Sequence, residues 1–82
     1  MKNKVLVKLI VPDIDETYDI FLPINKKIGE IIILITKSIN EHEIIDLPNN
    51  KILYNRSTGK NYEPNVLIKN TDIRNGTNLI LL

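Results

Sequence analysis

The sequence predicts a two-layer α+β domain, in which one long helix covers one face of a mixed sheet of four to five strands. The chain has 82 residues, the size of a single domain, which we assign to residues 1–82. Apolar, β-branched segments at both ends predict strands, and helical spacing of apolar residues is confined to one central stretch. Because one helix covers one face of a sheet, the other face is expected to meet solvent.

The chain opens with a predicted β-hairpin. The apolar run over residues 5–11 is typical of a strand, and Pro12 ends it because proline cannot continue a central ladder. Residues 12–16 contain Pro12 and three carboxylates and predict a polar turn. Residues 17–22 then alternate between apolar and other side chains, which indicates the returning strand.

The predicted helix begins near Asn25, a residue type that caps helix N-termini, and runs to about Asn40. Its apolar residues are spaced to form one stripe along the helix. These residues are Ile28, Ile31, Ile32, Ile35 and Ile39. Because Gly29 weakens the first turn, we expect packing of this stripe to hold the helix in place.

The second half of the chain predicts short strands joined by turns. We expect strands over residues 51–55 and 77–82, a strand stub over 60–62 and one helical turn over 70–73. Gly59 and the Asn75-Gly76 pair supply turn residues. Since parallel crossovers are right-handed, the most economical order places the first and last strands side by side at the centre. That is the β-grasp arrangement.

Composition excludes several classes of function. The chain has no cysteine, which rules out disulfides and thiolate chemistry, and its formal charge of +1 is too small for nucleic-acid binding. The longest apolar run, residues 31–35, is far shorter than the ~20 residues of a membrane span. The first residues lack the features of a signal peptide. We therefore expect a cytoplasmic protein with no nucleic-acid partner and no membrane insertion.

No motif predicts catalysis or a bound cofactor. His42 is the single histidine and has no nucleophile or ligand set beside it in the sequence. Gly59-Lys60 lacks the spacing of a phosphate loop and fits a hairpin turn better. Four carboxylates near the first turn are interpreted as solvated: Asp13, Asp15, Glu16 and Asp19. We expect a non-enzyme with no catalytic residue, no metal and no cofactor.

The sheet face turned away from the helix carries the main functional hypothesis. Alternation along strands predicts which residues face the helix: Val5, Val7, Leu9, Ile20, Leu22, Ile52, Tyr54, Leu79 and Leu81. The residues predicted on the open face are Leu6, Phe21, Leu53, Ile80 and Leu82. Together they would expose roughly 300–500 Å² of apolar surface, a size often tied to binding. The hypothesis is a docking surface for a protein partner or a second copy of the chain; compositional drift toward isoleucine and leucine is the alternative.

The chain resembles ubiquitin-like proteins from residue 5 to residue 82, and among them the YukD/EsaB group of Gram-positive bacteria. The resemblance is carried by Val5-Leu6-Val7-Lys8, the Ile28/Ile31/Ile35 spacing, Lys51-Ile52-Leu53-Tyr54, and the stretch from Asn70-Thr71-Asp72-Ile73 through Asn75-Gly76 to Leu79-Ile80-Leu81-Leu82. That group is associated with type VII (WXG100) secretion. The resemblance implies a cytoplasmic accessory or regulatory component that docks a protein of the secretion machinery.

Two alternatives stay open beside this interpretation. One is a sulfur carrier or protein modifier of the ubiquitin-like class, which would need a flexible tail ending in Gly-Gly. Leu82 stands instead at the end of a predicted strand, so we expect a non-conjugated protein. The other alternative is a free-standing ubiquitin-like domain with an unrelated partner.

Overall fold

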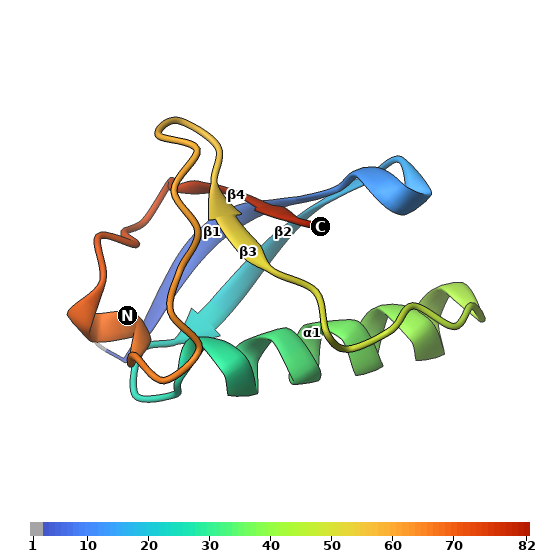
Figure 1. The fold of residues 1–82 in the computed structure, drawn as a ribbon, viewed down its shortest axis with the longest axis horizontal. Coiled ribbons are helices and arrows are strands. Elements are labelled where there is room, and N and C mark those ends of the chain that lie inside the picture. The colour runs from blue at the N-terminus through green and yellow to red at the C-terminus, as the bar shows by residue number, and fades with distance from the viewer. Residues whose placement is uncertain (1–2) are drawn as a thin grey trace.

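The computed structural model describes residues 3–82, which fold into a mixed four-stranded sheet with a helix lying across one face (Figure 1). The elements are β1 (Lys4–Val11), β2 (Glu16–Pro23), α1 (Ile28–Glu43), β3 (Leu53–Asn55) and β4 (Asn78–Leu81), with 3-10 turns at Pro12–Ile14 and Ile68–Asn70. The strand order is β2-β1-β4-β3. The central pair, β1 and β4, is parallel, and the other neighbours are antiparallel. The predicted two-layer β-grasp arrangement is confirmed.

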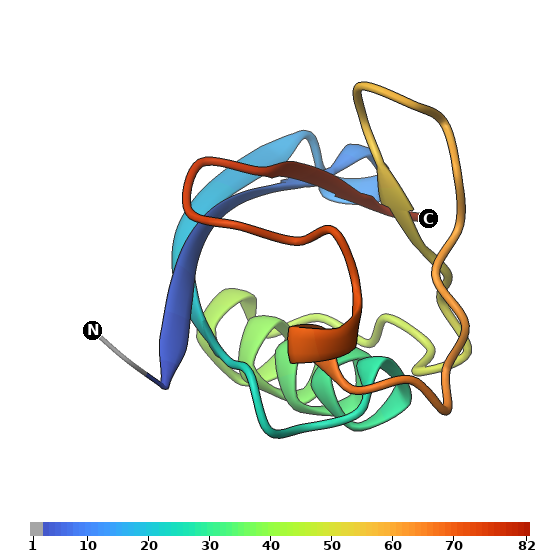
Figure 2. The same cartoon turned by 90° about the vertical axis from the view of Figure 1, so that its left-hand side faces the viewer.

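The core lies between the sheet and α1. Figure 2 shows how these two layers face each other. All five isoleucines of the predicted helical stripe are buried. They pack with inward residues of every strand, which include Val7, Leu9, Leu22, Leu79 and Leu81. Thr36 is also buried, and its hydroxyl donates to the Ile32 carbonyl oxygen at 2.7 Å, so that its polar atom is satisfied within the helix.

The N-terminus of α1 differs from the prediction. Asn25 is not the cap, because the helix begins at Ile28 with Lys27 in the cap position. The N–H groups of Ile28 and Gly29 donate to the carbonyl oxygens of Val66 and Pro64, each at 2.9 Å. The first helical donors are therefore satisfied by a loop distant in the sequence, which takes over the function of a local side-chain cap.

The segment after β3 is less regular than predicted. Over residues 60–62 the structure has a single bridge, between Tyr54 and Asn61, and no fifth strand. Gly59 has φ of +74°, which confirms the turn predicted around it. The helical turn lies at Ile68–Asn70, two residues earlier than predicted, and the N–H of Thr71 donates to the Ile68 carbonyl oxygen at 3.0 Å to close it. Among residues 3–82 no helix is long and apolar enough to cross a membrane.

The C-terminus of α1 contains a strained residue, Ile44. Its φ of +56° lies in the left-handed region, which β-branched side chains rarely adopt, and its side chain is 89% exposed. Glycine at this position removes the strain, although it also raises the entropy of the unfolded chain. We therefore expect Ile44→Gly to raise the free energy of unfolding by about 0.5–1 kcal/mol.

Urea unfolding followed by circular dichroism measures this change. The matched control is Ile44→Ala, which also removes exposed apolar surface but leaves a side chain in the left-handed conformation. A gain for Ile44→Ala as large as that for Ile44→Gly would contradict backbone strain as the cause.

Candidate docking surface

The sheet face opposite α1 carries a group of neighbouring apolar side chains on β1, β4 and the β3 segment. Ile80 on β4 pairs with Ile10 on β1 and with Tyr54 on β3. Beside them, Ile52 and Leu82 exchange two backbone hydrogen bonds of 2.7 and 3.0 Å, which places their side chains on the same face. We call Ile10, Ile52, Tyr54, Ile80 and Leu82 the β4 patch. Ile52 and Leu82 are 43% and 49% exposed, and the other three are partly buried.

Leu53 was predicted on this open face, and the prediction is wrong. Leu53 is fully buried and pairs with Leu81 of the core. The alternation was assigned one residue out of step: Ile52 and Tyr54, predicted to face the helix, lie on the open side instead. A one-residue shift moves every side chain of a strand to the other face.

Leu6 and Phe21 do lie on the open face, but apart from the β4 patch. They are directly paired across β1 and β2 and are 40% and 53% exposed. The next row of the sheet is polar, with Lys8 paired to both Asp19 and Asn78. The Lys8 ammonium lies 3.8 Å from the Asp19 carboxylate. The predicted surface is therefore divided by a polar row into the Leu6–Phe21 pair and the β4 patch.

Sequence reasoning missed three residues of the β4 patch. Ile10 follows Leu6 and Lys8 in the alternation of β1, so that signal was present in the sequence. Ile52 and Tyr54 carried no such signal. Ile52-Leu53-Tyr54 is a continuous run of nonpolar or aromatic residues, which does not show which of its side chains face the core.

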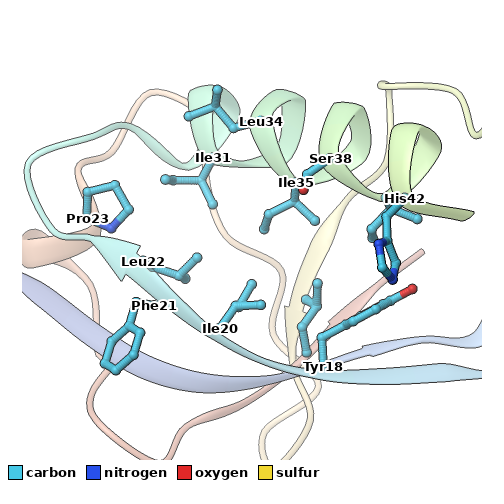
Figure 3. A pocket seen from close by; sticks show the side chains of 12 residues that line it. Tyr18, Ile20, Phe21, Leu22, Pro23, Ile31, Leu34, Ile35, Ser38 and His42 are labelled. Atoms are coloured by element: carbon cyan, nitrogen blue, oxygen red, sulfur yellow. The ribbon is translucent and has the colours of Figure 1, made fainter.

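A second apolar surface lies between β2 and α1. It is an open groove of about 380 Å³. Figure 3 shows side chains from both elements, among them Ile20, Leu22, Ile31 and Leu34, lining it.

At one end of the groove, the Tyr18 hydroxyl donates to Glu43 Oε2 at 2.7 Å, which ties β2 to the last turn of α1. Partial burial and this hydrogen bond raise the pKa of Tyr18 to about 12.

The remaining polar residues named in the sequence analysis do not come together in one site. Asp13 forms an ion pair with Lys51, and Asp19 forms one with Lys8. His42 lines the end of the groove beside Tyr18. Within residues 3–82, no group of three His, Cys, Asp or Glu side chains is placed to hold a metal ion.

No protein-family model and no curated protein sequence matches the chain. Solved structures do. The EccD5 ubiquitin-like domain from Mycobacterium xenopi has a TM-score of 0.68 at 15% identity, over 96% of this chain and 92% of that domain. A chain of the MycP5-free ESX-5 inner membrane complex has a TM-score of 0.71 at 12% identity, over 98% of this chain but 21% of that one. A chain of toluene 4-monooxygenase, in complex with an inhibitor, has a TM-score of 0.78 at 4% identity, over 95% of both chains.

These likenesses establish the architecture. At such low identity they show the fold alone, and the monooxygenase shows that the same fold occurs in proteins of a different kind. Together with the strand order and the helix position, they show that this chain has the ubiquitin-like β-grasp fold.

Proposed function

We propose that the protein is a non-conjugated ubiquitin-like interaction module that docks a protein partner through the β4 patch. The observation that carries this proposal is the position of Ile52 and Leu82, whose apolar side chains are nearly half exposed beside Ile80 on an uncovered sheet face. A soluble domain gains nothing in stability from such exposure, and grouped exposed apolar side chains commonly mark interaction sites.

The composition of the β4 patch suits a protein interface. Its centre is aliphatic with one tyrosine, Tyr54, a residue type enriched among side chains that dominate binding energy. On the side toward Leu6, the patch is bordered by the polar row of Lys8, Asp19 and Asn78. An apolar centre with a polar border is the usual anatomy of a protein–protein interface.

The proposed role is that of a cytoplasmic accessory or regulatory component of a type VII secretion system, without enzymatic activity. The fold's likeness to the EccD5 domain and to a chain of the ESX-5 inner membrane complex supports this assignment. The resemblance of the final segment, residues 73–82, to the YukD/EsaB group supports it independently. The partner would then be a secretion-machinery protein that offers a complementary apolar surface.

The test is binding to purified secretion proteins encoded beside the gene, measured by calorimetry. We expect the double variant Ile52→Asp/Leu82→Asp to weaken binding by about 30-fold or more, because it places two charges in the contact. Leu6→Asp is the matched control, since Leu6 is 40% exposed on the same face but beyond the polar row. Unchanged affinity in the folded double variant would reject this surface.

Sedimentation of the unmodified protein at two concentrations tests the alternative occupant. A dimer that the double variant abolishes would assign the β4 patch to self-association instead of a secretion partner.

A further inference from the structure

Asn75 and Gly76 form the centre of the turn that leads into β4, and they are the single Asn-Gly pair of the chain. The Thr77 N–H closes this turn by donating to the Arg74 carbonyl oxygen at 3.0 Å. Gly76 has φ of +89°, which the third residue of a type II turn requires and which favours glycine. The turn therefore places an asparagine side chain directly before the least hindered backbone nitrogen that a protein chain offers.

The backbone of Leu6 holds both members of this pair. The Leu6 N–H donates to Asn75 Oδ1, and the Gly76 N–H donates to the Leu6 carbonyl oxygen, each at 2.8 Å. The Asn75 side-chain oxygen thus replaces a backbone acceptor and continues the hydrogen bonding between β1 and the β4 segment beyond the first residue of β4. These two bonds dock the turn of residues 74–77 on β1.

An asparagine followed by glycine is the sequence in which the side-chain amide is lost most readily. The Gly76 nitrogen loses its proton and attacks Asn75 Cγ, which forms a five-membered succinimide ring. The bond from Cγ to the side-chain nitrogen breaks, and that nitrogen takes up a proton and leaves as ammonia. Water then opens the ring at either carbonyl carbon and gives aspartate or isoaspartate, with no change of oxidation state.

The docked turn opposes the first step of this reaction in two ways. The proton that Gly76 must lose is engaged with the Leu6 carbonyl oxygen. A type II turn also sets ψ of Asn75 at about +120°. Ring closure needs ψ of the opposite sign, because only then does Cγ lie over the Gly76 nitrogen. Asn75 and Gly76 are exposed to solvent, so exclusion of water does not account for the protection.

We propose that Asn75 is a deamidation site whose reactivity is controlled by the docking of residues 74–77 on β1. The reaction proceeds when the turn leaves β1, and it cannot be reversed. The aspartate product keeps an oxygen that accepts the Leu6 N–H. Isoaspartate instead routes the main chain through its β-carbon, which lengthens the chain before Gly76 and displaces the Gly76 N–H from Leu6. This site goes beyond the proposed function, because it needs no partner at the β4 patch.

Mass spectrometry of the protein and its peptides measures the reaction at neutral pH, with and without urea. We expect deamidation at Asn75 to be at least tenfold slower in the folded protein than in the urea-unfolded protein, because most molecules hold the turn closed at any moment. Equal rates in the two states would overturn the proposal. A faster reaction in the folded protein would overturn it too, by showing that the Leu6 N–H activates the Asn75 amide.

Amide hydrogen exchange gives a quantitative check on the unmodified protein. Exchange of the Gly76 N–H requires the same departure from Leu6 as deamidation does. Folding should therefore slow the two processes by factors that agree within about tenfold. A larger difference would overturn opening of the turn as the controlling step.

A matched pair of threonines separates opening of this turn from unfolding of the domain. Thr77 Oγ1 accepts the Arg74 N–H at 2.8 Å inside the turn, whereas Thr71 Oγ1 accepts the Ile73 N–H at 3.2 Å outside it. We expect Thr77→Val to speed deamidation of the folded protein about threefold or more and Thr71→Val to leave it unchanged. Equal acceleration by both variants would overturn local docking as the protection. If Thr77→Val does not fold, the comparison with Gly76 exchange decides.

Discussion

Leu53→Ala is expected to lower the free energy of unfolding by about 2–5 kcal/mol. The Leu53 side chain is fully buried beside Leu81, and truncating it loses both its transfer from water and its contacts with the core. A domain of this size has a total stability of roughly 5–10 kcal/mol, so the variant would retain a small margin. Urea unfolding followed by circular dichroism measures the difference.

Ile52→Ala is the matched control, because it truncates a neighbouring aliphatic side chain that is 43% exposed on the opposite face. We expect it to cost less than about 1 kcal/mol. A larger loss for Ile52→Ala than for Leu53→Ala would mean that Ile52, and not Leu53, faces the core.

The parts of the fold that the sequence predicted correctly are those with a long periodic signal. The isoleucine stripe of α1 spans three turns, and no other secondary structure would bring those side chains to one face. The opening hairpin was similarly constrained, because a polar turn separates two strands of eight residues each. Given these two elements and a final apolar strand, the rule that parallel crossover connections are right-handed predicts that β4 pairs with β1 at the centre of the sheet.

The parts that the sequence did not predict depend on contacts between distant residues. The pairing of Leu53 with Leu81 determines which β3 side chains face the core, since a continuous apolar run is compatible with either choice. The start of α1 is set by hydrogen bonds to Pro64 and Val66, which no capping pattern in the local sequence predicts.

The same limitation explains the outcome for the candidate docking surface. Leu6, Phe21, Ile80 and Leu82 lie on the open face as predicted, because alternation within long or well-bounded strands determined their side. Their division by the Lys8 row follows from the register between strands, which composition does not encode. The groove beside β2 also arises between two elements, so neither strand nor helix pattern could reveal it.

Asn55→Ala is expected to lower the free energy of unfolding by about 2–3 kcal/mol, because the buried Asn55 side chain organises the turn after β3. Its Oδ1 accepts the N–H groups of Ser57 and Thr58 at 2.8 and 3.3 Å, and its Nδ2 donates to the Tyr62 hydroxyl at 3.0 Å. That hydroxyl in turn donates to Asp72 Oδ1 at 2.6 Å. Alanine leaves the two backbone donors without their acceptor and severs the link to Tyr62.

Tyr62→Phe separates these contributions, because it removes the hydroxyl but leaves both turn hydrogen bonds of Asn55 in place. We expect it to cost about 1 kcal/mol, the usual net contribution of a hydrogen bond. Amide hydrogen exchange should then show faster opening at Ser57 and Thr58 in Asn55→Ala than in Tyr62→Phe. Equal stability losses in the two variants would show that the turn holds its shape without the Asn55 side-chain oxygen.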